Sequence, residues 1–245
     1  MKGETIIDYI GMTGKDKRGT PYKIIEWTKA NNLVIEFQDE FHYQTKTTMQ
    51  NFRRGQIKNP YDKIIANTGY IGVGKHTSRI SHNGAVRREY KIWSEMLRRC
   101  YSEKLQIKQP AYIGCTVCDE WHNYQNFADW YDKNYYDIGE GRMHLDKDII
   151  HKGNRVYSPD SCLFVPQRIN MIFMHKGKES DLPTGISETA TGYMASYNTR
   201  YLGTYKILDE ALKYYMIEKR IHIKNVADEY KDKIPTKLYQ ALINW

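Results

Sequence analysis

The chain has 245 residues, 37 of them Lys or Arg against 29 Asp or Glu, and its formal net charge of +8 favours a polyanionic partner, nucleic acid above all. No stretch approaches the roughly 18 consecutive apolar residues of a membrane helix, and the N-terminus carries no signal-peptide pattern, so we expect neither a membrane span nor secretion. Four cysteines in such a chain then favour a reducing, cytoplasmic environment over a disulfide framework.

Residues 1–60 carry short strand-like runs separated by turn signals. Two of these runs, 23–27 and 33–37, flank an Asn-Asn turn signal, which predicts a small antiparallel barrel or sheet. The pattern over residues 22–60 resembles the SH3-like modules at the N-termini of phage proteins. The resemblance implies a small β-rich module and indicates little about function.

The composition changes between residues 51 and 88, where basic side chains far outnumber acidic ones and five glycines occur. Within this stretch, residues 61–88 are predicted to form a basic linker that its glycines keep flexible. Two interpretations stay open: a linker that tracks a phosphate backbone, or a solvated tether without a partner. The side chains expected to contact DNA under the first interpretation are Arg53, Arg54, Lys75, Arg79, Arg87 and Arg88.

Two amphipathic helices are predicted in the central region, over about 88–103 and 121–131. Aromatic and apolar side chains recur in both at helical spacing, and we expect them to lie in a core. A Cys-x-x-Cys pair lies between the helices, but one such pair is a weak zinc signal, so buried thiols are the favoured interpretation. The alternative is a structural zinc ion on Cys100, Cys115, Cys118 and Cys162.

The stretch 143–173 reads as strand, loop and helix. Asp146 ends the expected strand, a glycine-containing loop follows, residues 157–160 (Tyr-Ser-Pro-Asp) give a helix-start signal, and Asn170 lies in the amphipathic segment after it. Two oxygen donors brought together in this way can hold a hard divalent cation against a phosphate. This ordered set resembles the HNH, or ββα-metal, nuclease motif.

The HNH resemblance implies roles for individual residues. Asp146 matches the metal ligand at the strand end and Asn170 the ligand on the helix, with Mg²⁺ or Mn²⁺ as the implied ion. Lys147 stands where the family has its general-base histidine, and a protonated lysine can neutralise a phosphate but cannot accept a proton. His144 lies two residues before Asp146, so both side chains point to one face of the strand. The residues considered as the base are His144, His151, Tyr112 and Tyr157.

The C-terminal region reads as a small sheet followed by a helix, after a linker expected at 176–183. The predicted strands lie near 184–187, 192–197 and 200–205, and the predicted helix covers 209–219. This order, with Tyr-Leu-Gly-Thr-Tyr before an Asp-Glu-Ala-Leu helix, resembles the AP2 DNA-binding domain. That resemblance implies that the sheet lies in the major groove of DNA. The strand and turn residues implied to face DNA are Tyr193, Ser196, Tyr197, Asn198 and Arg200.

The last stretch, 226–245, is predicted to form one or two short helices, broken at Pro235, that pack on the AP2-like module. The sequence as a whole thus predicts an α+β protein with a β-rich module (1–60), an HNH-like domain with flanking helices (89–176) and an AP2-like module (184–245).

The implied function is a metal-dependent endonuclease of the phage or homing type that acts on double-stranded DNA in the cytoplasm of a bacterium. Two alternatives stay open. One is a DNA-binding protein that has kept the HNH scaffold without catalysis, and the other is a phage protein that binds a protein partner. The sequence indicates no particular oligomeric state.

Overall fold

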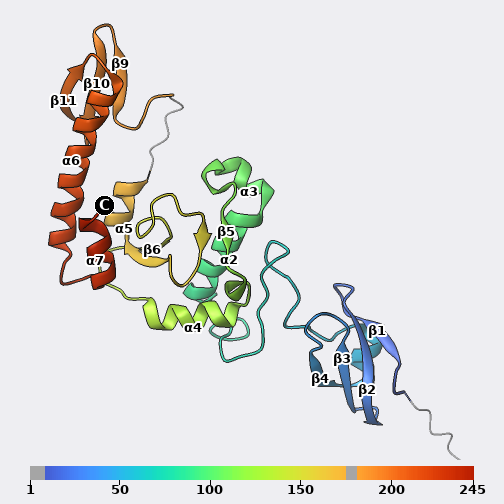
Figure 1. The fold of residues 1–245 in the computed structure, drawn as a ribbon. Coiled ribbons are helices and arrows are strands. Elements are labelled where there is room, and N and C mark those ends of the chain that lie inside the picture. Colours follow the sequence, from blue (N-terminus) through green and yellow to red (C-terminus); the bar gives the residue numbers. More distant parts are fainter. Residues whose placement is uncertain (1–8, 175–180) are drawn as a thin grey trace, which may run out of the picture. The chain divides into compact units, whose positions relative to one another are not determined.

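A computed structural model of the chain describes residues 9–174 and 181–245 (Figure 1). The secondary structure is mixed α and β with several small sheets, which confirms the predicted α+β class. The chain divides into two compact units, and the boundary between them falls between residues 131 and 132, inside helix α4. Most of the linker predicted at 176–183 lies outside the described residues. No helix in the described ranges has the combined length and apolar character that a membrane span requires.

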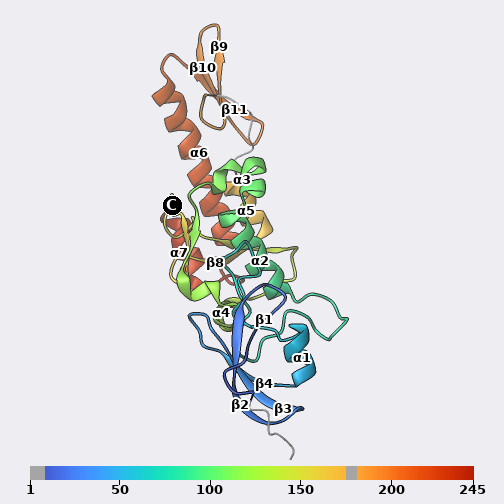
Figure 2. The ribbon, with the colours of Figure 1, turned by 90° about the vertical axis from the view of Figure 1, so that its right-hand side faces the viewer.

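The first unit begins with a four-stranded antiparallel sheet in the order β1-β2-β3-β4, followed by a short helix (Figure 2). Thr48 caps that helix by accepting a hydrogen bond from the backbone N–H of Asn51 at 3.2 Å. The buried hydroxyl of Tyr22 in β2 donates to the backbone oxygen of Phe52 at 2.8 Å and ties sheet to helix. The elements are β1 (Thr13–Lys15), β2 (Pro21–Lys29), β3 (Asn32–Phe37), β4 (Gln44–Thr47) and α1 (Met49–Arg54).

The rest of the first unit is helical around an aromatic core. Both predicted helices are present, the second preceded by a 3₁₀ turn. Trp93, Trp121 and Phe127 are fully buried, and the indole N–H of Trp93 donates to the backbone oxygen of Trp121 at 2.7 Å. The aromatic stripes are therefore core, as predicted. The elements are α2 (Arg88–Tyr101), α3 (Glu103–Lys108), η1 (Pro110–Tyr112), β5 (Thr116–Val117), η2 (Asp119–His122) and α4 (Tyr124–Asn134).

Part of the predicted linker packs closely on these helices. A Cβ atom at Gly69 would lie 2.3 Å from the side chain of Leu97, and one at Gly72 would lie 2.2 Å from that of Asn123. The buried amide of Gln125 makes three hydrogen bonds of 2.9–3.1 Å to backbone groups of the same segment. The glycines here allow close approach, so the prediction that they keep this segment flexible is wrong for residues 69–76.

We predict that Gly69→Ala destabilises the first unit by about 1–3 kcal/mol, because the added methyl group overpacks the contact with Leu97 and Trp93. Gly19→Ala is the control: its φ of +92° makes alanine unfavourable, but no atom lies within 4 Å of the new Cβ. Urea denaturation of the two variants and the wild type measures the difference. Equal stabilities for Gly69→Ala and the wild type would contradict close packing of this segment.

The second unit contains a ββα element followed by a three-stranded sheet and two helices. Strand β6 pairs antiparallel with β8, and α5 starts directly after β8 and contacts both strands (Figure 1). The helix start predicted at 157–160 is therefore wrong: the chain forms a turn there and then β8, and the helix begins at Gln167. The elements are β6 (Met143–Asp146), β7 (Val156–Tyr157), β8 (Leu163–Pro166), α5 (Gln167–Phe173), β9 (Ile186–Thr189), β10 (Gly192–Tyr197), β11 (Arg200–Tyr205), α6 (Leu208–Glu229) and α7 (Thr236–Ile243).

The C-terminal sheet has the antiparallel order β11-β10-β9. Asn198 and Thr199, with φ of 47° and 69°, form the left-handed two-residue turn that joins β10 to β11. The first half of α6 packs on one face of the sheet, where Ala195 and Ala211 are fully buried. Helix α6 continues ten residues beyond the end predicted at residue 219.

The second half of α6 leaves the sheet and packs on the ββα element (Figures 1 and 2). Pro235 directly precedes α7 and interrupts the helical structure there, as predicted. The last stretch packs on α6 and also on the ββα element, a contact that the prediction did not include. The residues of this shared core are Ile149, Val165, Ile169, Ile223, Val226, Ala227, Tyr230, Ile234, Leu238 and Leu242.

Candidate functional site

Asp146 is the last residue of β6 and lies opposite Leu163 of β8. Its Oδ1 atom accepts hydrogen bonds from the backbone N–H groups of Asp148 and Ile149, both at 2.8 Å. These bonds close the turn after the strand and fix the orientation of the carboxylate. Because both fall on Oδ1, Oδ2 is the oxygen that remains for a ligand.

Burial raises the pKa of Asp146 above its ordinary value. The two backbone hydrogen bonds act in the opposite direction, and the negative charge of Asp148 adds to the rise. The ionised carboxylate is therefore poorly solvated near neutral pH. A cation beside Oδ2 would offset that cost, which is a property expected of a metal ligand.

Asn170 lies on α5, next to the fully buried Ile169, and its side chain is partly exposed. Helix α5 contacts β6, so the element that carries Asn170 packs against the strand that ends at Asp146 (Figure 1). The described residues contain no group of three or more His, Cys, Asp and Glu side chains arranged to hold a metal ion. One carboxylate and one amide oxygen suit Mg²⁺, which keeps several waters or phosphate oxygens as ligands.

Lys147 is turned into the loop rather than toward a substrate. Its Nζ atom lies 2.7 Å from each carboxylate oxygen of Asp148 and donates to the backbone oxygen of Asn154 at 2.8 Å. The Asn154 amide donates back to the Lys147 backbone oxygen at 2.9 Å. Only 7% of Lys147 is exposed, so its charge serves to hold the loop closed. In this arrangement the ammonium group is bound within the protein, and a role of Lys147 in neutralising a phosphate stays a prediction.

The four residues considered as the general base occupy different places. His144 lies on β6, opposite Val165, and is half-buried. His151 is exposed in the loop, and Tyr157 is buried with its ring near the Lys147 ammonium, 5.7 Å from ring centre to Nζ. Tyr112 belongs to the first unit. His144 is the one of the four on the same strand as Asp146, two residues away.

The cysteines give no support to the zinc alternative. Cys100, Cys115 and Cys162 are buried and Cys118 is partly buried. Burial raises the pKa of the Cys118 thiol, and nearby Glu120 and Asp119 raise it further.

Two of the basic residues predicted to contact DNA in the first unit, Lys75 and Arg87, form ion pairs with acidic side chains. Lys75 lies 2.9 Å from Asp129, whose pKa falls to about 2 because of its bonds to His76 and Lys75. Arg87 lies 3.6 Å from Glu89. Arg79 donates to a backbone oxygen at 3.0 Å, whereas Arg53, Arg54 and Arg88 are exposed. The positive charge of this segment is therefore partly neutralised by ion pairs that the sequence analysis did not predict.

The sheet of the second unit presents a different face from the one predicted. Tyr193 and Tyr197 share the face of Ala195 and pack toward α6, where the Tyr197 hydroxyl lies 2.7 Å from Nδ1 of His222. Burial raises the pKa of Tyr197 to about 12. Arg200 lies 3.4 Å from Glu218 of α6. The prediction that these tyrosines face DNA from the open side of the sheet is therefore wrong. The open side carries Ser187, Met194, Ser196, Tyr201 and Thr204.

The two tyrosines were assignable from strand alternation, because residues 193, 195 and 197 share one face and a small residue between two rings indicates close packing. Tyr201, which the sequence analysis missed, is 61% exposed and donates or accepts a hydrogen bond with Thr204 at 3.1 Å. Tyr201 lies opposite Ser196, one pair from the turn at 198–199, so the register of the hairpin places it on the open side, and strand alternation could have assigned it as well.

Comparison of the chain with family models, curated proteins and solved structures found no match in any of the three. The geometry and charge of the ββα element therefore carry the functional argument.

We predict that Asp146→Asn raises the melting temperature at pH 7 in the absence of metal. A raised pKa means that the protonated form stabilises the fold, and this stability is lost as pH rises through the folded-state pKa. Asparagine keeps the Oδ1 acceptor without the charge, so the difference from wild type should shrink toward about pH 4.

Asp129→Asn is the matched comparison with the opposite sign. The pKa of Asp129 is lowered, so its ionised form stabilises the fold at neutral pH, and the substitution should lower the melting temperature slightly. A lower melting temperature for Asp146→Asn at pH 7 would show that the fold requires the Asp146 charge.

Proposed function

We propose that the chain is a metal-dependent nuclease that hydrolyses phosphodiester bonds of DNA at the ββα element. The observation that carries this proposal is the Asp146 carboxylate, which is held by two backbone amides, destabilised by burial, and left with one oxygen for a ligand. Asn170 on the adjoining helix supplies a second oxygen of the type that hard divalent cations prefer.

The side chains of this element have distinct parts in the proposed reaction. Asp146 and Asn170 would hold a divalent cation, which stabilises the negative charge that builds on the phosphate and on the leaving oxygen. His144 would take the proton from the attacking water, since a neutral imidazole accepts protons near pH 7 and Lys147 is held by Asp148. The Lys147–Asp148 pair keeps the loop in the shape that places Asp146.

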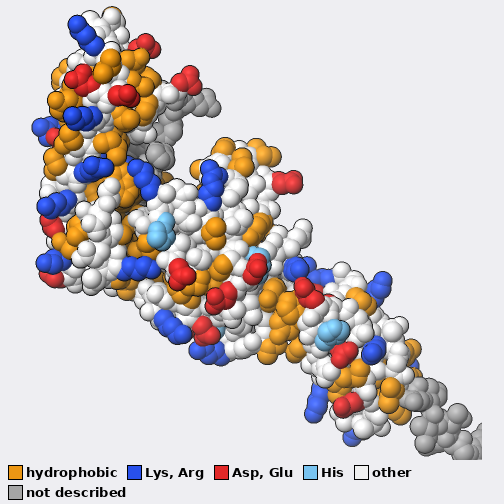
Figure 3. Space-filling view, viewed as in Figure 1, with side chains coloured by type: hydrophobic (Ala, Val, Ile, Leu, Met, Phe, Trp, Pro, Cys, Tyr) orange, Lys and Arg blue, Asp and Glu red, His pale blue; other side chains and the backbone are white. Residues whose placement is uncertain are grey.

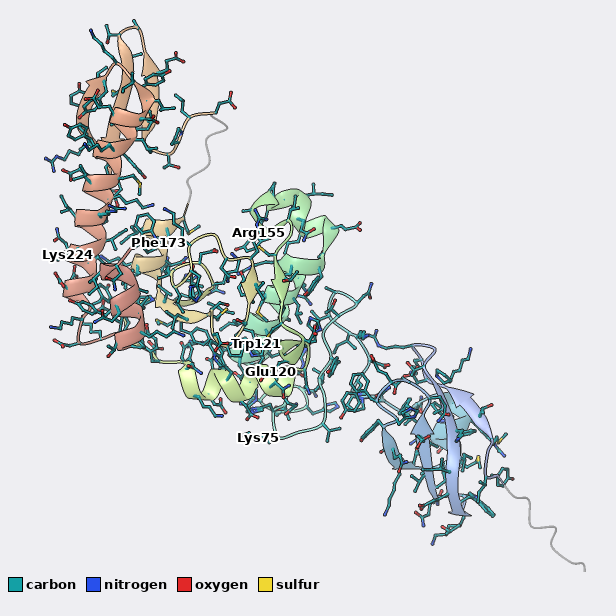
Figure 4. The ribbon with its side chains drawn as sticks, viewed as in Figure 1. Lys75, Glu120, Trp121, Arg155, Phe173 and Lys224 are labelled. Atoms are coloured by element: carbon teal, nitrogen blue, oxygen red, sulfur yellow. The ribbon has the colours of Figure 1, made fainter. Side chains whose placement is uncertain are left out.

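Helix α6 offers positive charge for the DNA backbone. Lys213, Arg220 and Lys224 are exposed and follow one side of the helix at spacings of seven and four residues. Figure 3 shows Lys and Arg side chains along the outer edge of the region that α6 occupies in Figure 1, and Lys224 is labelled on α6 in Figure 4. We therefore propose α6, rather than segment 51–88, as the main phosphate contact.

One observation favours a second candidate function, a DNA-binding protein without catalysis. The position where related motifs carry the general base holds Lys147, and its three hydrogen bonds keep it inside the loop. In that case the Asp146 carboxylate serves only to close the turn after β6.

A plasmid nicking assay with Mg²⁺ or Mn²⁺ tests the first proposal. We expect Asp146→Ala and Asn170→Ala each to lower the cleavage rate by at least about 100-fold, or about 2.7 kcal/mol of transition-state stabilisation. Asp160→Ala, which removes an exposed carboxylate of the turn between β7 and β8, should cleave as the wild type does. Cleavage that survives both ligand substitutions would exclude this metal site, and DNA binding without cleavage by the wild type would favour the second candidate.

His144→Gln tests the assignment of the base. We expect it to lower the cleavage rate at pH 7 with little change in DNA affinity, and to remove the rise of rate with pH that titration of an imidazole produces. His151→Gln, in the exposed part of the loop, is the control. An unchanged pH–rate profile in His144→Gln would show that another group accepts the proton.

Salt dependence of DNA binding tests the role of α6. Lys224→Gln should weaken binding to duplex DNA and lower the slope of log affinity against log salt by about 1, because one phosphate contact is lost. Lys75→Gln, whose charge is paired with Asp129, should change the slope much less. Equal effects of the two substitutions would contradict the assignment of α6.

A further inference from the structure

A hollow of about 360 Å³ opens in the second unit between the loop after β6 and helix α7. Its apolar parts are Ile149, Ile150, Ala241 and the indole of Trp245. Its polar parts are two ammonium groups, of Lys152 and Lys237, and the amides of Gln240 and Asn244. This combination of an aromatic plane, cations and amides within one small volume is typical of a binding site for a ligand with a flat ring and an anionic group.

Two ammonium groups lie over the Trp245 indole, and a third lines the hollow. The Nζ atom of Lys152 lies 4.7 Å from the ring centre and that of Lys219 lies 4.8 Å from it. Lys237, at the rim, donates to the backbone oxygen of Asp160 at 3.0 Å. None of the three ammonium groups forms an ion pair with a carboxylate in the part of the chain that the structure describes.

Lys219 makes this arrangement costly. It lies on α6 with 9% of its surface exposed, and its second ring contact is with Phe173 at 5.8 Å (labelled in Figure 4). Burial lowers the pKa of Lys219, and the positive charge of Lys152 lowers it further. The two rings attract the Lys219 ammonium, but it is buried, repelled by Lys152 and unpaired with any carboxylate of the described residues, so an anion bound beside Lys152 would stabilise it.

We propose that this hollow binds one unpaired nucleotide of a nucleic-acid strand, with the base on the Trp245 indole and the phosphate beside Lys152 and Lys237. The inference rests on the proposed function, because it assumes a nucleic-acid partner. A base inside a duplex is stacked on both faces, so the nucleotide must be unpaired or turned out of the helix.

The geometry favours a nucleotide over a simple anion. Trp245 lines the hollow, and the Lys152 ammonium lies over its ring at 4.7 Å, so a base that stacks on the indole would take the place of this ammonium and bring the phosphate to it. The amide of Gln240 can bond the polar edge of a base. One wall of the hollow, at Ile149, begins three residues after Asp146. A strand with one nucleotide in this hollow would therefore pass close to the turn that carries the candidate metal ligand.

The test measures binding of a short single-stranded oligonucleotide to the full chain carrying Asp146→Asn, which blocks cleavage. Trp245→Leu should weaken this binding by about 10-fold, because one stacked base is lost. Lys152→Gln should lower the salt slope by about 0.7, the value for one phosphate of a single strand. Lys231→Gln, an exposed lysine of the same unit outside the hollow, should leave both quantities unchanged.

Two further variants keep the test independent of folding. Trp245→Phe retains a stacking ring and should bind more tightly than Trp245→Leu at equal melting temperature. Lys219→Met should raise the melting temperature without nucleic acid and weaken oligonucleotide binding. A lower melting temperature with unchanged binding would assign Lys219 to packing alone and contradict its part in the site.

Other outcomes would overturn the inference. If Trp245→Leu folds and binds the oligonucleotide as tightly as its parent, the hollow does not hold a base. Equal affinity for intact and abasic oligonucleotides would show that phosphate alone is bound. These results are independent of plasmid nicking. If the wild type nicks DNA but Trp245→Leu binds the oligonucleotide as tightly as its parent, the proposed function stands and the inference fails. If the wild type does not nick DNA but Trp245→Leu weakens oligonucleotide binding, the nucleotide site stands and the proposed nuclease activity fails.

Discussion

The packing of the ββα element against α6 and α7 is the constraint on which the rest of the second unit depends. Val165 of β8 and Ile169 of α5 are fully buried in this core, together with Ala227 of α6 and Leu238 of α7. The candidate metal ligand Asn170 directly follows the buried Ile169 in the chain. The hollow at Trp245 forms along the edge of the same core. The side chains of the proposed sites are thus positioned by close packing of buried apolar residues.

The loop after β6 uses two neighbouring carboxylates in different ways. Asp148 receives the ammonium group of Lys147, so its charge is paired within the loop. Asp146 receives only backbone N–H groups on one oxygen, and burial raises its pKa. Asp148 therefore stabilises the loop through its ion pair. The ionised Asp146 is destabilised by burial, and a bound cation would offset that cost. Such an unequal division of charge is more informative about function than the presence of two acids.

Positive charge in this chain has a similar division. In the first unit Lys75 and Arg87 meet acids, which reduces what they could offer to DNA. In the second unit Lys152 and Lys219 face the Trp245 ring without an anionic partner among the described residues. The net charge of the sequence does not distinguish the paired basic residues from those without an anionic partner. What favours a polyanion is the place where the charge stays uncompensated.

The sequence by itself determined most of the elements and their order. Strand alternation, helical spacing, and the turn signal at 198–199 act between near neighbours, so the three C-terminal strands, α2, and the strand and helix at the two ends of 143–173 were predictable. Strand β8 was not predicted, because its pairing with β6 joins residues about 20 positions apart in the chain. The positions of Asp146 at a strand end and Asn170 on a helix follow from the same local patterns.

Only the tertiary structure decided which groups meet. The acids that pair with Lys75, the inward turn of Lys147, the helix-facing side of Tyr197 and the contacts that exclude a Cβ at Gly69 all depend on partners distant in sequence or on backbone geometry. Local propensity carries no information on such partners, because they are brought together by burial of a common core. The cations around Trp245 belong to the same class: α5, α6, α7 and the loop after β6 meet there, and no short stretch of sequence contains them all.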